Sequence, residues 1–463
     1  MIKRCCVVIW LPVVLAAAAL HAGEERTLTL EQAVHIALDR NPQMLIAEKE
    51  VAKARAVVWE AFGALMPTLE ATAVVNHSWE IQTTTIPNFL KPMLEPLAPS
   101  IPEFADMPDF VEMSFGMENL VTYGASLRQP LFLGGAGIAG VRLAKVAREA
   151  SEQQLESRRQ NLIYGTTRAF YGCLLAKELV RVQEDALAQA EANLAAVEAQ
   201  HEVGSASGFD KMRSEVEVAN LKPDVISSRN DYRSALTGLR TILGLPADSQ
   251  IAVDGDLTFV PDDYGDQPLS SLRELADENR PELHAMRAQK TMASRSVAIA
   301  KSGFLPKVFF STDYSNQASR NDWDFTGDDF SKGFSSAISV QLPLFDGLRN
   351  VKAHQKAQLD YRIADDRERQ LADAVAGEVE VARNGLQVAS EKCAAAQESV
   401  ALAREALRLA NLRYEEGAST QLDVLGSQLA MQRAELNHVS ALFEYQMARY
   451  GLRLATGTLG GLL

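Results

Sequence analysis

The feature that most constrains this chain is a heptad repeat near its C-terminus. A larger side chain recurs every seventh residue, and an alanine stands three residues after each of the first four. The two series are Leu386, Cys393, Val400, Leu407 and Tyr414, and Ala389, Ala396, Ala403 and Ala410. After Gly417 another series follows: Leu422 with Leu425, Leu429, Leu436 with Val439, Phe443 and Tyr450. The pattern predicts two antiparallel coiled-coil helices that meet at a tip.

The first of these helices is predicted to be very long. No proline occurs between residues 347 and 416, so a helix of roughly 70 residues would span about 100 Å. Such a helix does not enclose a compact core. The 463 residues could supply several ordinary domains, but the periodicity favours fewer and elongated units.

The first 22 residues are typical of a cleaved secretory signal peptide. Lys3 and Arg4 precede an apolar run over residues 5–20, and Ala22 stands before Gly23. The alternative is a membrane anchor, but the run is shorter than the roughly 20 residues that a spanning helix needs. No cysteine follows the cleavage site, so nothing indicates lipid attachment.

The composition excludes several classes of function. The net charge of −14 gives no basic surface for nucleic acid. Cys173 and Cys393, which remain after the leader, occupy heptad core positions and are interpreted as packing residues rather than a disulfide. The seven histidines are scattered, and neither a metal cluster nor a catalytic grouping is found. We therefore expect no enzyme, no metal and no cofactor.

The chain contains an internal duplication. Asn41-Pro42 matches Arg280-Pro281 at a shift of 239 residues, and three later landmarks match at a shift of 213. These landmarks are Pro130 with Pro343, Gly204 with Gly417, and Gly244 with Gly457. The predicted organisation is a signal peptide (1–22), a first repeat (23–244), an equatorial linker (245–266), a second repeat (267–457) and a tail (458–463).

Both repeats present the same order of elements. A short helix (29–40; 269–279), for which Thr29 and Ser270 are candidate caps, precedes a second helix (43–64; 282–303). Two strands, a long helix, a glycine tip and a return helix (208–243; 420–456) follow. Between its strands the first repeat has 26 more residues, and this proline-rich stretch (86–108) is expected to be irregular and exposed.

The four strand segments alternate between apolar and polar residues. Their apolar members include Leu69, Ala71, Ala73 and Val75; Val121, Tyr123, Ala125 and Leu127; Val308, Phe310 and Tyr314; and Phe334, Ile338, Val340 and Leu342. A half-buried soluble sheet and a transmembrane barrel both give this pattern. Since only four strands are expected and they lead directly into the long helices, no further layer covers an apolar face. Three chains that supply twelve strands would close a barrel.

A literal G-x-G-x-x-G spans residues 135–140. A dinucleotide site needs a βαβ unit of about 30 residues, whereas here a helix of roughly 65 residues is expected. We interpret these glycines as a change of chain direction between strand and helix.

Several short motifs resemble TolC-like outer-membrane efflux proteins. They are Arg413-Tyr414-x-x-Gly417 followed by Asp423-Val424-Leu425, the Pro-Leu-Phe-x-Gly turns from strand to helix (Pro130 to Gly134; Pro343 to Gly347), and the glycines that close each repeat. The resemblance covers residues 27–457. It implies a mostly α fold with a smaller β part: a homotrimer in which a twelve-stranded outer-membrane β-barrel, in contact with lipid, continues into a periplasmic α-barrel.

The resemblance also implies a function and partners. Such a channel passively conducts efflux or secretion substrates that it receives from an inner-membrane transporter through a periplasmic adaptor protein. A periplasmic coiled-coil scaffold without conduction is the alternative. The sequence does not identify the substrate.

The family pattern assigns roles to the two tips. Tyr414, Asp210 and Asp423 match gate residues, although Ser419 and Gly426 stand where the family often has an arginine and a second aspartate. The adaptor-docking tips are Val203, Gly204 and Ser205, and Glu416, Gly417 and Ala418, with Ser205 in place of the usual leucine. The aspartates also suit the first turn of a helix, where the dipole favours negative charge.

Pro223 is a further candidate because the duplication pairs it with Leu436. It interrupts a heptad series of Phe209, Met212, Val216 and Ala219. Because a proline inside a helix removes a hydrogen bond and clashes with the preceding turn, we expect a bend over residues 219–223. The alternative is that Pro223 marks a helix end.

Overall fold

The computed structural model describes residues 26–94, 96, 100–101 and 106–461. The expected signal peptide and the last two residues of the expected tail lie outside them. The chain divides into two compact units, one of residues 1–51, 150–286 and 367–463, the other of residues 52–149 and 287–366. These units cut across both sequence repeats, because each long helix has residues in both.

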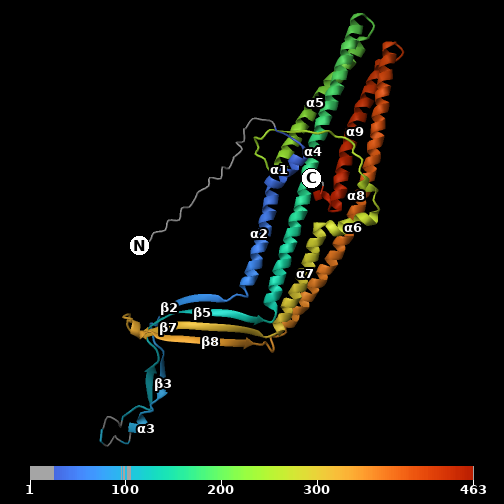
Figure 1. Cartoon of the computed structure of the whole chain (residues 1–463). Coiled ribbons are helices and arrows are strands. Elements are labelled where there is room, and N and C mark those ends of the chain that lie inside the picture. The colour runs from blue at the N-terminus through green and yellow to red at the C-terminus, as the bar shows by residue number, and fades with distance from the viewer. Residues whose placement is uncertain (1–25, 95, 97–99, 102–105, 462–463) are drawn as a thin grey trace, which may run out of the picture. The chain divides into compact units, whose positions relative to one another are not determined.

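The helices reproduce the duplication residue by residue (Figure 1). The long helices α4 (Ala136–Glu202) and α8 (Arg349–Glu415) have 67 residues each, and the return helices α5 (Gly208–Ile242) and α9 (Gln421–Ala455) have 35 each. All four bounds of the second set lie 213 residues after those of the first. The short helices α1 (Leu30–Arg40) and α6 (Leu269–Asn279) differ by 239.

The expected seam of α8 is confirmed. Between residues 391 and 418, only seven residues are buried or half-buried, and all others are exposed. Those seven are Cys393, Ala396, Val400, Ala403, Leu407, Ala410 and Tyr414. Both cysteines are free and belong to one core cluster, as expected, and burial raises the pKa of the Cys173 thiol to about 12.

The heptad seams predicted for the return helices are wrong near the tips, because their residues are exposed there. Phe209, Met212 and Val216 of α5 are 70%, 62% and 52% exposed. The intramolecular contact of α5 instead uses Ser214, Val218, Leu221 and Val225, and α9 uses Gln421, Val424 and Met431 rather than Leu422 and Leu429. Each return helix has two apolar stripes, and the heptad pattern alone did not show which one faces the same chain.

The four glycines at the tips and return-helix ends share one geometry. Gly204, Gly244, Gly417 and Gly457 all have φ between 67° and 75°. In each case the glycine N–H and the next N–H donate back to the last turn of the helix, for example Gly417 to Tyr414 O and Ala418 to Arg413 O. This is the Schellman ending, which favours glycine because its left-handed residue has no Cβ.

The residues that precede Pro42 and Pro281 cap the C-terminal ends of the return helices. Asn41 Nδ2 donates to Ile242 O at 2.8 Å, and Arg280 Nη1 donates to Leu454 O at 3.2 Å and to Ala455 O at 3.3 Å. Asn41 precedes α2 (Pro42–Gly63), and Arg280 precedes α7 (Pro281–Lys301). The two residues occupy equivalent positions, so each repeat caps its own return helix with the residue before the proline.

The helix caps agree with expectation in one repeat only. Thr29 forms a capping box with Gln32 at the start of α1. The assignment of Ser270 is wrong, because α6 begins after Pro268 and has no side-chain cap.

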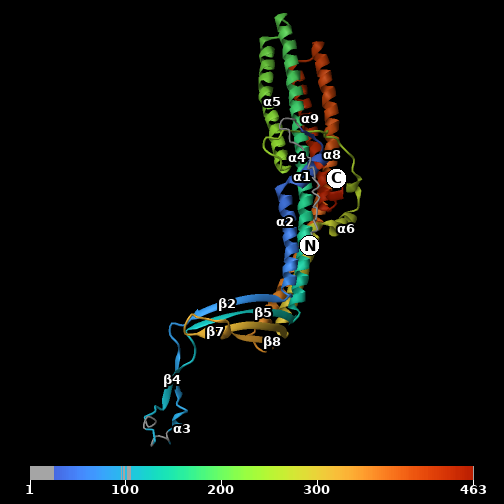
Figure 2. The same ribbon diagram turned by 60° about the vertical axis from the view of Figure 1, so that its left-hand side comes forward.

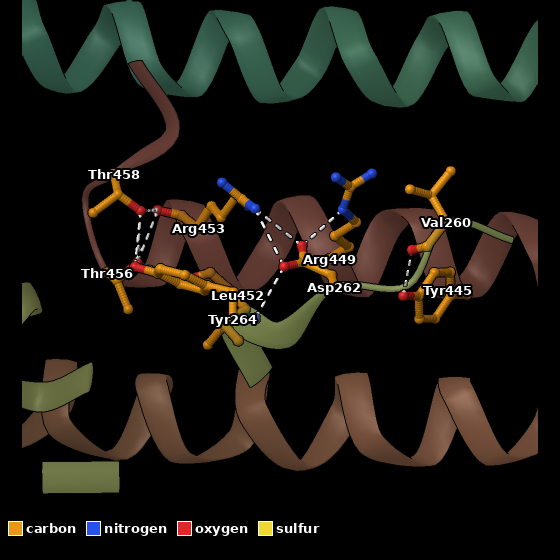
Figure 3. A network of polar contacts seen from close by, with 9 residues as sticks. All are labelled: Val260, Asp262, Tyr264, Tyr445, Arg449, Leu452, Arg453, Thr456 and Thr458. Carbon is orange, nitrogen blue, oxygen red and sulfur yellow. Dashed lines mark hydrogen bonds and ion pairs between the residues drawn. The ribbon is translucent and has the colours of Figure 1, made fainter. Parts of the chain in front are cut away.

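The expected equatorial linker is fastened to α9 by a polar network (Figure 3). The Asp262 carboxylate, 6% exposed, accepts from Arg449 Nε at 2.7 Å, from Arg453 Nη2 at 3.1 Å and from the Tyr264 N–H at 3.0 Å. Burial by itself raises the pKa of Asp262, but these hydrogen bonds outweigh it, and the pKa lies below its usual range. The linker is therefore held by a paired, buried charge.

The linker also contains regular structure. Its strand β6 (Ile251–Val253) pairs in parallel with β1 (Arg26–Leu28). A 3-10 turn, η3, follows at Asp263–Asp266. The Tyr264 hydroxyl bonds to Thr456 and Thr458, just past α9.

The second unit contains an antiparallel four-stranded sheet (Figure 2). Its order is β2-β5-β7-β8, formed by β2 (Thr68–His77), β5 (Asn119–Leu133), β7 (Lys307–Arg320) and β8 (Ser331–Gln341). The four expected strand segments are thus confirmed. The sheet has two edges, β2 and β8, that pair on one side only.

The register confirms that the apolar residues share a face. Ala71 lies opposite Ala125, which lies opposite Tyr314 and then Phe334. The adjacent row on the other face is Glu70, Ser126, Asp313 and Ser335. Side chains of β8 are exposed along the whole strand, and those of β2 up to Asn76. This burial pattern differs from that of a half-buried soluble sheet.

Most described residues of the proline-rich stretch (86–108) are irregular, as expected, apart from the short helix α3 (Lys91–Leu94). The sequence did not predict the hairpin that borders this stretch, formed by β3 (Thr83–Pro87) and β4 (Phe110–Ser114). Several prolines lie outside the paired residues, so their clustering did not prevent the strands from forming. Residues 95, 97–99 and 102–105 of this stretch are outside the description.

The two strand-to-helix turns differ. Pro130 does not lie in a turn: it belongs to β5 and lies opposite Phe309, beyond the last β2 pair at Thr68 and Arg128, where an edge tolerates a proline. Gly134 and Gly135 then adopt φ of 62° and 86°. In the second repeat, Pro343 follows β8, and Gly347 and Leu348 have φ of 70° and 67°.

The G-x-G-x-x-G stretch is part of the first of these turns. Gly135 has a positive φ, and a Cβ on Gly137 would collide with the Leu65 side chain. Because β5 is antiparallel to both neighbours and leads into 67 helical residues, the dinucleotide interpretation is excluded.

A first prediction concerns the glycines that end the return helices. A Cβ at Gly457 would lie 2.6 Å from the Asn279 backbone, and one at Gly244 would lie 2.7 Å from Arg40 O. We expect Gly457→Ala and Gly244→Ala each to lower the free energy of unfolding by more than about 1 kcal/mol. Gly385→Ala, in α8 with no neighbour within 4 Å, should instead stabilise by about 1 kcal/mol. Thermal melts followed by circular dichroism distinguish them; equal effects at all three sites would contradict this account.

A second prediction concerns the Asp262 network. Because its folded-state pKa is lowered, its contribution to stability is complete above the unfolded pKa of about 4 and is lost as pH falls through the folded pKa. Asp262→Asn should destabilise by about 3 kcal/mol at pH 7, since it leaves two arginines without their anion. The difference from wild type should shrink below about pH 4. Asp266→Asn, at an exposed position in the same segment, is the control; a pH-independent difference would refute the assignment.

Candidate functional site: the paired helix tips

The candidate site lies where the two helix pairs, α4/α5 and α8/α9, end in glycine turns. Gly204 and Gly417 occupy equivalent places, and a Cβ on either would meet nothing within 4 Å. Val203, Ser205, Glu416 and Ala418 are exposed, and Val203 is 77% exposed. The six expected docking residues therefore present open surfaces at the ends of both pairs.

Tyr414 connects the two pairs. Its hydroxyl donates to Gln200 Oε1 on α4 at 3.0 Å. Burial and the charge of Asp210 raise the pKa of Tyr414, so the hydroxyl stays a donor at neutral pH. Tyr414 and Asp210, both expected at the gate, are thus brought close together.

A second contact lies at the start of α9. The Gln421 Nε2 group donates to Ser214 Oγ and, at 3.3 Å, to Asp210 O. Gln421 is 5% exposed and Ser214 is 1% exposed. Farther from the tip, Gln432 Nε2 donates to Gln183 Oε1 at 2.8 Å.

The two aspartates cap their own helices. Asp210 Oδ2 accepts from the Ser207 N–H at 3.2 Å. Asp423 Oδ2 accepts from the Thr420 N–H at 2.9 Å, from Thr420 Oγ1 at 2.7 Å and from Ser419 Oγ at 2.9 Å. These bonds lower the pKa of Asp423. Ser419, which stands where the family often has an arginine, therefore serves the cap of α9.

Pro223 lies inside the continuous helix α5. The alternative that it marks a helix end is therefore excluded. The bend over residues 219–223 stays a prediction.

Sequence reasoning missed the glutamines. Gln200, Gln421 and Gln432 follow no recognised motif, but the duplication offers a signal. Their counterparts in the other repeat are Arg413, Gly208 and Ala219, so the copies differ where the two helix pairs of one chain meet.

The described residues also lack the features of a metal site and of a membrane-spanning helix. They contain no group of three or more acidic, histidine or cysteine side chains placed to hold a metal. Among the helices in this part of the chain, none combines the length and apolar character needed to cross a membrane.

Comparison with known proteins identifies the class. The outer membrane efflux protein family model matches residues 33–245 and 272–458, one stretch in each repeat. The chain therefore belongs to the outer membrane efflux protein family, and it is an outer-membrane channel.

Individual relatives are distant but cover most of the chain. The alkaline protease secretion protein AprF of Pseudomonas aeruginosa is 24% identical over 93% of this chain and 85% of its own length. The outer membrane protein TolC of Vibrio cholerae is 23% identical over 74% and 77%. The solved structure of VceC from Vibrio cholerae superposes with a TM-score of 0.75 at 18% identity, covering 92% of this chain and 96% of the other, which confirms the fold.

A third prediction concerns Tyr414. Tyr414→Phe removes the donor to Gln200, and Asp210→Asn removes the neighbouring charge, so each should loosen the tips and raise single-channel conductance in planar bilayers. Tyr361→Phe, on the same helix but half exposed away from the tips, should leave conductance unchanged. If the Tyr414/Asp210 double variant conducts like wild type, other groups hold the tips closed.

Proposed function

We propose that the protein acts as a homotrimer that forms the exit duct of a tripartite efflux or type I secretion system. In this proposal an inner-membrane transporter and a periplasmic adaptor deliver the substrate, and the duct conducts it passively. The observation that carries the proposal is the pair of unpaired sheet edges, on strands whose side chains are almost all exposed on both faces.

The sheet edges support closure by further copies of the chain. Strands β2 and β8 each have a single neighbour, and a bilayer requires every backbone N–H and C=O to be paired. Pairing β2 of one chain with β8 of the next satisfies both edges. Three chains of four strands give a twelve-stranded barrel, with the face of Leu69, Tyr314 and Phe334 toward lipid and that of Glu70 and Asp313 toward the lumen.

The helices support the same assembly. The exposed stripe on α5, with Phe209, Met212 and Val216, recurs on α9 as Leu422 and Leu429. On α8, a separate exposed stripe includes Val381, Val388, Leu402 and Leu409, spaced at multiples of seven. Stripes with heptad spacing on the outside of a coiled-coil pair are suited to packing against helices of neighbouring chains.

The tips support contact with an adaptor. Both present an exposed glycine turn with short side chains around it, and two equivalent tips per chain give six in a trimer. A helical hairpin of an adaptor could pack against such turns without a large side chain in the way. Tip residues that face solvent serve no packing within the chain.

The names of two relatives indicate different substrates. One is an alkaline protease secretion protein, and the CzcC protein of Cupriavidus metallidurans is a cobalt-zinc-cadmium resistance protein. The common design supports conduction rather than one substrate class. A scaffold without conduction has no need for strands that alternate apolar and polar faces.

A fourth prediction tests the assembly. Extracted in detergent, the protein should run as a trimer that dissociates on heating, and it should form pores in planar bilayers. Met212→Glu and Val216→Glu in the α5 stripe should reduce the trimer fraction by at least tenfold, because charges would be buried at the contact. Glu215→Gln, on the same helix, is the control. A monodisperse soluble monomer would overturn the proposal.

A further inference from the structure

The two kinds of contact at the tips differ in chemistry. Within each helix pair, exposed side chains form ion pairs. In α4/α5, Lys211 lies 3.1 Å from Glu198, and Arg229 lies 2.6 Å from Glu184. In α8/α9, Lys392 lies 3.2 Å from Glu444. Between the pairs, the side-chain hydrogen bonds described above join neutral groups. These amide and hydroxyl contacts must separate when the pairs move apart, together with the attraction between Arg181 of α4 and Glu435 of α9.

We propose that four residues outside the family gate pattern, Gln183, Ser214, Gln421 and Gln432, form an amide latch that holds the second helix pair of each chain against the first. The proposal rests on the proposed function for its role in conduction, since a duct needs a closed state. Its structural part, that the latch holds the tips together, stands on the contacts alone.

Gln421 is the central member because of its burial. It is the first residue of α9, and its Nε2 group reaches two acceptors on α5, Ser214 Oγ and Asp210 O. Its Oε1 atom is buried without a partner among the described residues. A buried amide is retained in one orientation only where its donors are satisfied, so the contact fixes how α9 sits on α5.

The Gln183–Gln432 bond gives the latch a second point. Between the two points lies a small cavity of about 20 Å³, lined by Val182, Leu221, Met431 and the side chains around Gln432. That volume admits about one water. The packing of Val424 and Met431, which are buried between the two points, is therefore interrupted, and the directional polar bonds add a defined register to it.

The duplication shows that the latch belongs to one contact only. The counterparts of Gln183 and Gln432 are Ala396 and Ala219, and the counterpart of Gln421 is Gly208. In a ring of alternating pairs, a first pair meets a second pair both within its own chain and in the next chain. The latch residues occur at the contact within the chain, whereas the exposed stripes of Phe209 and Leu422 remain for the contacts between chains. Opening would then break specific polar bonds inside each chain while the apolar contacts between chains slide.

The test is a double-mutant cycle on the full-length trimer in planar bilayers. Ser214→Ala should raise the ratio of open to closed channels by about tenfold, the effect of one lost hydrogen bond. Gln421→Ala should raise it further, because it also loses the bond to Asp210 O. The double variant should do little more than Gln421→Ala alone, because Ser214→Ala loses a bond that Gln421→Ala has already removed. Gln183→Ala and Gln432→Ala, which install the residues of the other repeat, should behave as a second such pair.

Ser427→Ala is the matched control. Ser427 is the counterpart of Ser214, but its hydroxyl donates to Asp423 O of its own helix at 2.8 Å. Ser427→Ala should leave the ratio of open to closed channels unchanged. Additive effects of Gln421→Ala and Ser214→Ala, or an effect of Ser427→Ala of the same size, would overturn the latch.

Hydrogen–deuterium exchange separates this inference from the proposed function. Amides of residues 207–215 and 420–428 should exchange faster by about tenfold in Gln421→Ala than in wild type, whether or not the protein conducts. Wild-type protein that forms no pores would contradict the proposed function. Unchanged exchange at these amides would contradict the latch, even if wild type conducts.

Discussion

The long helix α8 has apolar residues on more than one side, and the chain itself covers only one of them. The seam of α8, with Leu386, Cys393 and Tyr414, is covered within the chain, whereas Leu402 and Leu409 of the same helix are not. The same imbalance holds for the sheet, whose edge strands β2 and β8 are exposed on both faces. Uncovered stripes and unpaired edges are unfavourable in water or lipid, and the trimer proposed above would cover both in one assembly.

The ends of the helices are fixed more firmly than their middles. Glycine turns of one geometry end all four helices of the two pairs, and Asn41 and Arg280 cap the return helices from equivalent positions. The linker is bound to α9 through the Asp262 carboxylate. Asn41, Arg280 and Asp262 all act on the return helices at the ends opposite the tips, so the tips can move while those ends stay in place.

At the tips, the residues that are the same in both repeats have a different role from the residues that differ between them. The capping aspartates Asp210 and Asp423 are duplicated and serve equivalent helices, which accounts for their equal spacing from the tip glycines. The residues that join the pairs, Gln200, Gln421 and Gln432, are not duplicated. A function that distinguishes the contact within a chain from the contact between chains requires such divergence, because two identical repeats would give two identical contacts.

The sequence by itself determined the elements and their duplication. Proline-free heptads fixed the extent of α8 to within two residues, and the shift of 213 carried the bounds of α4 and α5 onto α8 and α9, since helix period and glycine endings are local properties. Local patterns did not decide which of two apolar stripes on α5 faces α4, nor that Pro130 continues β5, nor that β3 and β4 pair on either side of the proline-rich stretch. The partners of Gln421 and the rows that join Glu70 to Asp313 lie far apart in the chain. Only the tertiary structure decided these, because register and side-chain pairing depend on the neighbour that each surface meets.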